Sequence, residues 1–131
     1  MKKEQTVKWA GRILLVLTGL LALFHVLVLS GYVPADIVWD GEAGDSRETL
    51  IILEIVALCV TILFMIITAA KMRQIRTGAS RKIIDAGMWA VFVYFVLNTA
   101  GNLASGVTAE KLIFTPLTIL MALLALRLAL E

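Results

Sequence analysis

The sequence predicts an all-α integral membrane protein, a bundle of four helices with both termini in the cytoplasm. Three observations lead to this fold class: the composition, four long apolar segments and the distribution of basic residues. The chain has 131 residues, of which 60% are hydrophobic and 17% are charged. A soluble domain of this length would carry about a quarter charged residues. So much apolar surface must face lipid, which excludes a soluble enzyme and a disordered chain.

A transmembrane helix needs roughly 20 mostly apolar residues. Four segments meet this requirement, at residues 13–30, 50–70, 83–103 and 112–130. They leave only short tails and connections, so the sequence predicts a single transmembrane domain over residues 1–131. The first segment follows a basic tail, as a signal peptide does. Its apolar run is long for a signal peptide, and we expect it to stay in the protein.

Local residues fit the starts of the second and fourth segments. Asp45 followed by Glu48 resembles a capping box at the start of the second segment. Glu110 is favourably placed in the first turn of the fourth. Pro116 lies inside the fourth segment, where it removes the hydrogen bond to the carbonyl of Leu112 and favours a kink.

Basic residues are distributed very unequally along the chain. Ten of the twelve lie in the N-terminal tail, in the connection at residues 71–82 or near the C-terminus, whereas Arg47 and Lys111 lie on the other side. The positive-inside rule places the ten in the cytoplasm, so both termini are predicted to be inside. Trp39 suits the opposite, outer interface of the membrane. This bias also argues against dual topology.

The basic cluster at residues 71–82 is, in the simplest interpretation, the determinant of this topology. Anionic lipid or nucleic acid are the other ligands that such a cluster could bind, and we expect no nucleic acid. Asp85 and Arg127 are both predicted near the inner interface. An ion pair between them would fix the register of the third and fourth helices.

Polar residues inside a membrane are costly and usually face the bundle interior. In the predicted orientation, the strongest polar residues of all four helices lie at a similar level, in the outer half of the membrane. The inner half is nearly all apolar. The sequence therefore predicts a water-accessible pocket, open to the outside and closed below by apolar packing. Its predicted ligand-binding residues are His25, Glu54, Asn98, Asn102, Thr115 and Thr118.

Glu54 is the one acid well inside a predicted span, so it is the central ionisable group of this pocket. With a nearby His25, it could bind a cation, a proton or a small polar ligand. In the alternative interpretation, the polar residues only tie the helices together. The protein would then be a non-catalytic accessory or scaffold subunit.

Several signatures of catalysis and metal binding are absent from the sequence. It has one histidine and one cysteine, no Cys-x-x-Cys motif and no glycine-rich phosphate loop. We therefore expect no metal site, no cofactor and no enzymatic activity. An enzyme acting on a lipid or an isoprenoid is the third hypothesis.

Short motifs along most of the chain carry a family resemblance. They are Gly31-Tyr32-Val33-Pro34, Val38-Trp39, Glu54, Leu97-Asn98-Thr99-Ala100-Gly101-Asn102, Glu110-Lys111 and Thr115-Pro116-Leu117-Thr118. With these motifs the chain resembles a widespread, uncharacterised family of small bacterial four-helix membrane proteins. The resemblance implies a multi-pass protein of the bacterial cytoplasmic (inner) membrane and no particular reaction.

Small residues outside the inward faces indicate where a partner could pack. Ala100 and Ala104 have the small-xxx-small spacing that allows close approach of two helices. Besides the lipid bilayer, the expected partners are therefore a second copy of the chain or another membrane subunit.

Overall fold

The computed structural model describes residues 2–32, 47–79, 81–106, 108 and 110–131, without the side chains of Arg47 and Glu110. All described secondary structure is helical, which confirms the all-α class and the four helices. The elements are α1 (Lys2–Ser30), α2 (Arg47–Thr77), α3 (Lys82–Ala104), the π-helical turn η3 (Glu110–Phe114) and α4 (Thr115–Ala129).

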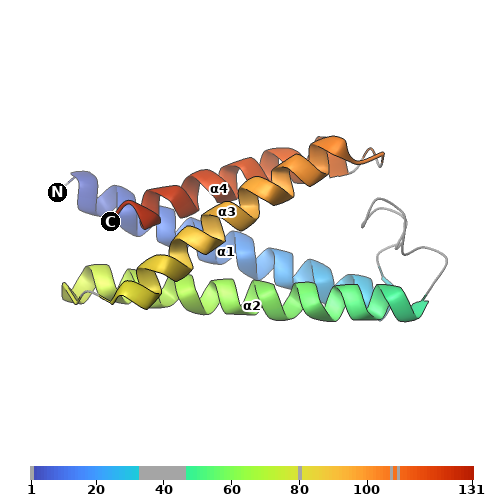
Figure 1. Ribbon diagram of the computed structural model, residues 1–131, viewed down its shortest axis with the longest axis horizontal. Helices are drawn as coiled ribbons and strands as arrows, with labels where there is room; N and C mark the ends of the chain where they lie inside the picture. The colour runs from blue at the N-terminus through green and yellow to red at the C-terminus, as the bar shows by residue number, and fades with distance from the viewer. Residues whose placement is uncertain (1, 33–46, 80, 107, 109) are drawn as a thin grey trace.

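The helices form two antiparallel hairpins, α1 with α2 and α3 with α4 (Figure 1). Both chain termini and the turn between α2 and α3 lie at one end of the bundle, which we call the termini end. The last turns of α1 and α3, the first turn of α2 and the π-turn η3 lie at the other end, which we call the cavity end. Packing of α1 against α4 is the main contact between the hairpins.

Each helix has one buried face, and most of its residues lie three or four positions apart along the chain. This 3-4 spacing is typical of helices that pack nearly parallel or antiparallel around a shared core. On α4 the buried face includes Thr118, Ala122 and Ala125. On α2 the buried positions are Glu54, Ala57, Thr61, Phe64, Thr68, Lys71 and Gln74.

The buried residues change character along the bundle. From its middle to the termini end the core is mainly apolar, and Leu14, Met88, Val91, Met121 and Leu128 are each fully buried there. Buried polar residues in this half include Lys71 and Gln74, close to the termini end. Towards the cavity end the same faces carry polar residues. The apolar core therefore closes one half of the bundle and leaves the other half polar.

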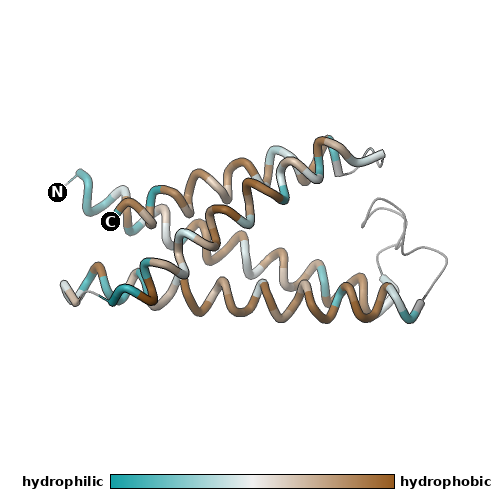
Figure 2. Tube along the Cα trace, in the orientation of Figure 1, coloured by the Kyte–Doolittle hydropathy of each residue, from teal (hydrophilic) through white to brown (hydrophobic). Residues whose placement is uncertain are grey.

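The outward faces of the helices are also apolar, and hydrophilic segments gather at the termini end (Figure 2). Exposed residues such as Val16, Leu63, Leu97 and Leu123 cover the middle of the bundle. All four helices are long and apolar enough to cross a membrane. A soluble bundle would place charged or polar residues on these faces.

Two helices extend beyond the predicted spans because their charged flanks continue the helix. α1 begins at Lys2 rather than at residue 13, and α2 runs to Thr77 rather than to residue 70. Lysine, arginine and glutamine are good helix formers, so the helix continues where the apolar run stops. α2 ends at Gly78, whose φ of 75° is the left-handed conformation that favours glycine, and whose N–H donates to the Gln74 carbonyl.

The π-turn η3 was not predicted; over residues 112–130 the sequence indicated a helix with a kink at Pro116. η3 comes two residues before Pro116, which lies in the first turn of α4. Proline cannot donate a backbone hydrogen bond, and its ring collides with the carbonyl four residues earlier in a regular α-helix. A wider turn at this point relieves that collision. The irregularity expected from Pro116 therefore takes the form of a π-turn.

α1 and α2 approach closely where Gly11 faces Met72. A Cβ atom built on Gly11 would lie 2.6 Å from Met72 Sδ and 2.7 Å from Met72 Cγ. Gly19, two turns further along α1, faces Met65 with ordinary room, because its Cβ would lie 3.7 Å from Met65 Cε. The hairpin thus depends on the absence of a side chain at Gly11.

This close approach predicts that Gly11→Ala changes the stability of the protein in opposite directions, depending on whether Met72 is present. Gly11→Ala should lower the stability of the purified protein, because overpacking costs about 1–3 kcal/mol. In a Met72→Ala background the same change should raise stability, since alanine is the better helix former. Thermal unfolding in detergent measures both effects. Gly19→Ala is the control and should not lower stability; equal losses at Gly11 and Gly19 would contradict the close approach.

Candidate functional site

A cavity of about 460 Å³ lies between the four helices, in the half of the bundle nearest the cavity end. Its size is within the range of sites for small organic ligands, roughly 300–1,000 Å³. Polar and apolar side chains alternate on its wall. The polar lining residues are His25, Glu54, Thr61, Tyr94, Asn98, Asn102 and Thr118. The larger apolar ones are Leu21, Phe24, Leu97, Phe114, Leu117 and Met121.

Glu54 and His25 form an ion pair or charge-assisted hydrogen bond in the wall of this cavity. His25 Nδ1 lies 2.6 Å from Glu54 Oε2. The Glu54 side chain is completely buried and that of His25 is 12% exposed. Burying a carboxylate is costly unless it is paired. The contact meets that requirement and joins α1 to α2 at the level of the cavity.

A second polar contact joins α3 to α4 on the opposite wall. The Thr118 hydroxyl oxygen accepts a hydrogen bond from Asn102 Nδ2 at 3.4 Å and lies 2.9 Å from the Thr99 hydroxyl. It also lies 2.9 Å from the carbonyl oxygen of Phe114, the last residue of the π-turn. The Thr118 hydroxyl therefore ties the irregular start of α4 to α3.

Five of the six residues predicted for the pocket line this cavity. Glu54 and His25 come together on one side, and Asn102 and Thr118 on the other. Asn98 lines the cavity between them, and its side chain makes no hydrogen bond with any described residue. Thr115 is buried one turn closer to the cavity end and is not part of the lining.

Some lining residues were not predicted for the site. Thr61 and Tyr94 belong to the inward faces, and the 3-4 spacing identifies both. The spacing of residues in the sequence does not predict that Phe24 and Phe114 line the cavity, because their positions depend on the packing of α1 against the π-turn. Their rings lie 5.2 Å apart in an edge-to-face arrangement. They supply an aromatic wall next to the polar residues.

Aromatic packing closes the cavity towards the termini end. Phe64 contacts Tyr94 and Phe95, with ring centroids 4.8 Å and 5.8 Å apart. Phe95 and the neighbouring Val91 are buried. Apolar packing therefore lies below the cavity, as predicted for its floor.

The chemistry available in the cavity is ion pairing and hydrogen bonding. It brings together one carboxylate, one imidazole, two amides and several hydroxyls. No group of three His, Cys, Asp or Glu side chains is placed to hold a metal ion among the described residues. A hard cation such as Ca²⁺ usually takes six or more oxygen ligands. The lining suits an organic ligand with one charged or hydrogen-bonding group better than a bare metal ion.

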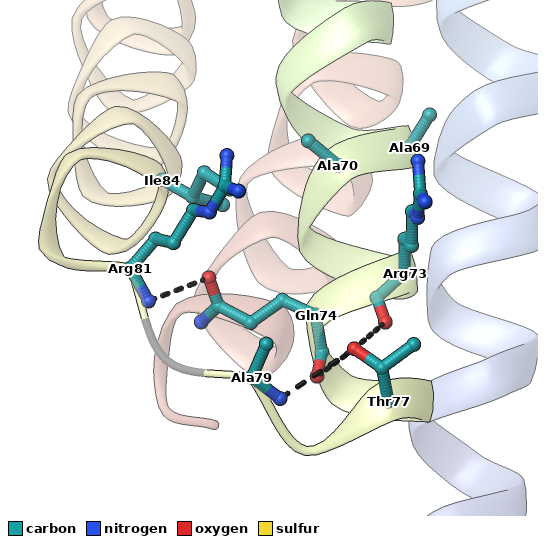
Figure 3. A pocket seen from close by; sticks show the side chains of 8 residues that line it. All are labelled: Ala69, Ala70, Arg73, Gln74, Thr77, Ala79, Arg81 and Ile84. Carbon is teal, nitrogen blue, oxygen red and sulfur yellow. Dashed lines mark hydrogen bonds between the residues drawn. The ribbon is translucent and has the colours of Figure 1, made fainter.

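The predicted ion pair between Asp85 and Arg127 was wrong. Asp85 Oδ1 instead accepts hydrogen bonds from Lys71 Nζ at 2.5 Å and from Gln74 Nε2 at 2.7 Å, which joins α3 to α2 at the termini end. The Gln74 side chain also accepts a hydrogen bond from the Arg81 backbone N–H (Figure 3). Asp85 therefore fixes the register of α2 against α3, not of α3 against α4.

Arg127 has a different partner because it lies one helical turn before Glu131. Its Nη1 donates to Glu131 Oε1 at 2.7 Å, and Lys3 approaches the same oxygen at 3.7 Å. This arrangement lowers the pKa of the Glu131 carboxyl below its usual value. Trp39, predicted at the outer interface, lies outside the described residues.

Lys71 is the buried residue that the sequence interpretation missed. It was counted as one of the basic residues in the connection at residues 71–82, but its side chain is completely buried. The sequence feature that indicates its burial is the 3-4 spacing of the buried residues on α2, which runs from Glu54 through Thr68 and includes Lys71 as the next position. Following that spacing beyond the apolar run would have placed Lys71 inside the bundle.

Comparisons of the chain with protein families, with curated proteins and with solved structures found no match. The resemblance to a bacterial membrane protein family therefore rests on the sequence motifs alone. The site is defined by its own geometry: a paired carboxylate and imidazole, an amide facing the cavity and an apolar floor.

Because Asp85 pairs with Lys71, neutralising Asp85 and neutralising Arg127 should lower the melting temperature by different amounts. Asp85→Asn leaves the buried Lys71 ammonium without its carboxylate and should lower the melting temperature by roughly 5 °C or more. Arg127→Gln breaks only a contact at the chain end and should lower it by less than roughly 2 °C. Thermal unfolding of both variants measures this. Equal losses in both variants would instead favour an Asp85–Arg127 pair, because either substitution would then break the same contact.

Proposed function

We propose that the protein is a four-span membrane protein whose cavity opens to the outside and binds a small organic ligand with a cationic group. The observation that carries this proposal is the fully buried Glu54 carboxylate, paired with His25 in the wall of a cavity of about 460 Å³. Intramembrane ionisable residues are rare and commonly mark binding sites or ion pathways.

Membrane insertion is supported by the apolar surface of the bundle and by the charges at its ends. All four helices meet the length and hydropathy needed to cross a bilayer. Ten of the twelve basic residues belong to the termini end, so the positive-inside rule puts that end in the cytoplasm. The cavity then faces the outside. The motif resemblance favours the bacterial cytoplasmic membrane.

The proposed ligand class follows from the lining of the cavity. Glu54 supplies a negative charge, and the Asn98 amide is available for a hydrogen bond. Phe24 and Phe114 supply aromatic surface, which suits the apolar body of a ligand and attracts cations. An organic ammonium group attached to a small apolar body would use all three features. It would share the Glu54 carboxylate with His25.

Binding is favoured over passive conduction because the cavity has a closed floor. Phe64, Tyr94 and Phe95 pack together below it. Transport of the ligand would require the helices to rearrange, as in transporters that alternate between two openings. Binding requires no such change.

The alternative is an accessory or scaffold subunit that binds no ligand. The specific observation in its favour is that the polar residues already pair across helices, Glu54 with His25 and Asn102 with Thr118. Such pairs stabilise helix packing in a membrane on their own. The two functions differ in what happens when Glu54 is neutralised.

The proposed orientation predicts the labelling of engineered cysteines in intact cells. In a Cys59→Ala background, Tyr32→Cys should react with a membrane-impermeant maleimide, since residue 32 follows the outer end of α1. Ala79→Cys, in the turn between α2 and α3, should react only after the membrane is permeabilised. Both positions are exposed. Labelling of Ala79→Cys in intact cells would contradict the orientation.

Neutralising Glu54 should remove ligand binding without removing the fold. Protein in nanodiscs is titrated with 2-phenylethylammonium as the test ligand, and the shift in melting temperature is measured. Glu54→Gln should weaken binding at least tenfold, because a charge-assisted hydrogen bond contributes about 1.5–3 kcal/mol. The neutral 2-phenylethanol should bind the native protein weakly.

Glu48→Gln is the matched control, since Glu48 is an exposed acid on the same helix and does not line the cavity. It should leave binding unchanged. If neither ligand shifts the melting temperature of the native protein while Glu54→Gln lowers its stability, the accessory function is the better account.

A further inference from the structure

A second cavity, of about 400 Å³, lies between α1 and α2 at the termini end. Its lining differs sharply from that of the first, because four basic residues surround it and only one acid does. The charged lining residues are Glu4, Lys8, Arg12, Arg73 and Arg76. The remaining lining residues, among them Leu15, Met72 and Ile75, are mostly apolar.

Within the part of the chain that the structure describes, three of the four basic side chains have no acidic partner. Glu4 lies one turn before Lys8 on the same helix, and its Oε1 is 3.8 Å from Lys8 Nζ, so Lys8 has an acidic partner. The Arg12 guanidinium lies over the Trp9 ring, 5.7 Å from its centroid, and meets no carboxylate. The side chains of Arg73 and Arg76 make no hydrogen bond or ion pair with any described residue. Their positive charge is uncompensated.

The arginines converge because two helices carry them to one place. Arg12 is on α1, and Arg73 and Arg76 are on the last turns of α2. The Arg73 side chain runs beside Ala69, on the side of α2 towards α1 (Figure 3). Ala69 lines the same cavity, and its small side chain leaves room there. A guanidinium presents a planar fork of donors that fits phosphate oxygens.

We propose that this cavity binds the phosphate headgroup of an anionic phospholipid in the inner leaflet. Arg12, Arg73 and Arg76 donate to the phosphate, and the apolar lining contacts the start of the lipid chains. Basic pockets between transmembrane helices on the cytoplasmic side are known to hold such headgroups. This site is separate from the ligand cavity at the other end, and its test does not depend on that ligand.

The surroundings of the cavity favour a lipid over a polyanion in solution. Trp9 is 56% exposed beside Arg12, and exposed tryptophan is typical of the headgroup level of a membrane. The exposed surface next to it is apolar: Ile13 and Val16 follow on α1. A nucleic acid would meet this apolar surface, whereas lipid chains would cover it.

Lipid titration of purified protein in a neutral detergent tests the proposal. The melting temperature is measured against added phosphatidylglycerol, phosphatidylcholine or inorganic phosphate. The variant Arg12→Gln/Arg73→Gln/Arg76→Gln is compared with Lys2→Gln/Arg81→Gln/Lys82→Gln, which removes three basic residues from the same end but none from the cavity. Single Arg76→Gln is included in case the triple variant does not fold.

The native protein and the control triple variant should be stabilised by phosphatidylglycerol at similar concentrations and much less by phosphatidylcholine. The cavity triple variant should need at least roughly tenfold more phosphatidylglycerol, and Arg76→Gln roughly fivefold more. Equal losses in both triple variants would overturn the site in favour of diffuse surface attraction. Equal stabilisation by phosphatidylcholine, or by inorganic phosphate at the same concentration, would overturn the anionic lipid as its ligand.

Discussion

The constraint on which this bundle depends is that a charge buried among apolar helices must have a partner on another helix. Glu54 and Lys71 are both completely buried on the same face of α2. Glu54 pairs with His25 on α1, and Lys71 pairs with Asp85 on α3. α2 is therefore held by one charge pair near each end, each to a different neighbour. Leaving either buried charge unpaired would cost more than the pair itself contributes, so the two contacts select one register for α2.

The same face of α2 is apolar or hydroxylic between its two charges, and this separation gives the bundle two different ends. Thr61 and Thr68 direct their hydroxyls to carbonyls of their own helix, so they need no partner elsewhere. Phe64 lies between them and closes the floor of the cavity against Tyr94 and Phe95. The polar cavity and the basic cavity share no lining residue, so each can be tested without the other.

The sequence predicted those features that depend on one helix at a time, and missed those that depend on how helices meet. The four helices and the inward faces of α2 and α4 follow from apolar length and periodicity, which are local properties. The approach of His25 to Glu54 could be inferred because both lie at the same depth. The partner of Asp85 could not, because depth alone left Arg127 and Lys71 as candidates. Only the position of Lys71 on the buried face of α2 decides between them, and counting it as part of a basic connection concealed that position.

The geometry of the two cavities also explains why the α1–α2 hairpin carries the charged chemistry. Gly11 lets α1 approach α2 closely at Met72. Arg12 and Arg73, each next to one of these two residues, line the basic cavity between the helices, and towards the other end His25 and Glu54 meet in the wall of the larger cavity. The α3–α4 hairpin contributes neutral groups, Asn98, Asn102 and Thr118, to that cavity. A cationic ligand would therefore be held by the α1–α2 hairpin through charge and oriented by the α3–α4 hairpin through hydrogen bonds. In the proposed function, Glu54 would supply the charged contact to the ligand and Asn98 a hydrogen bond.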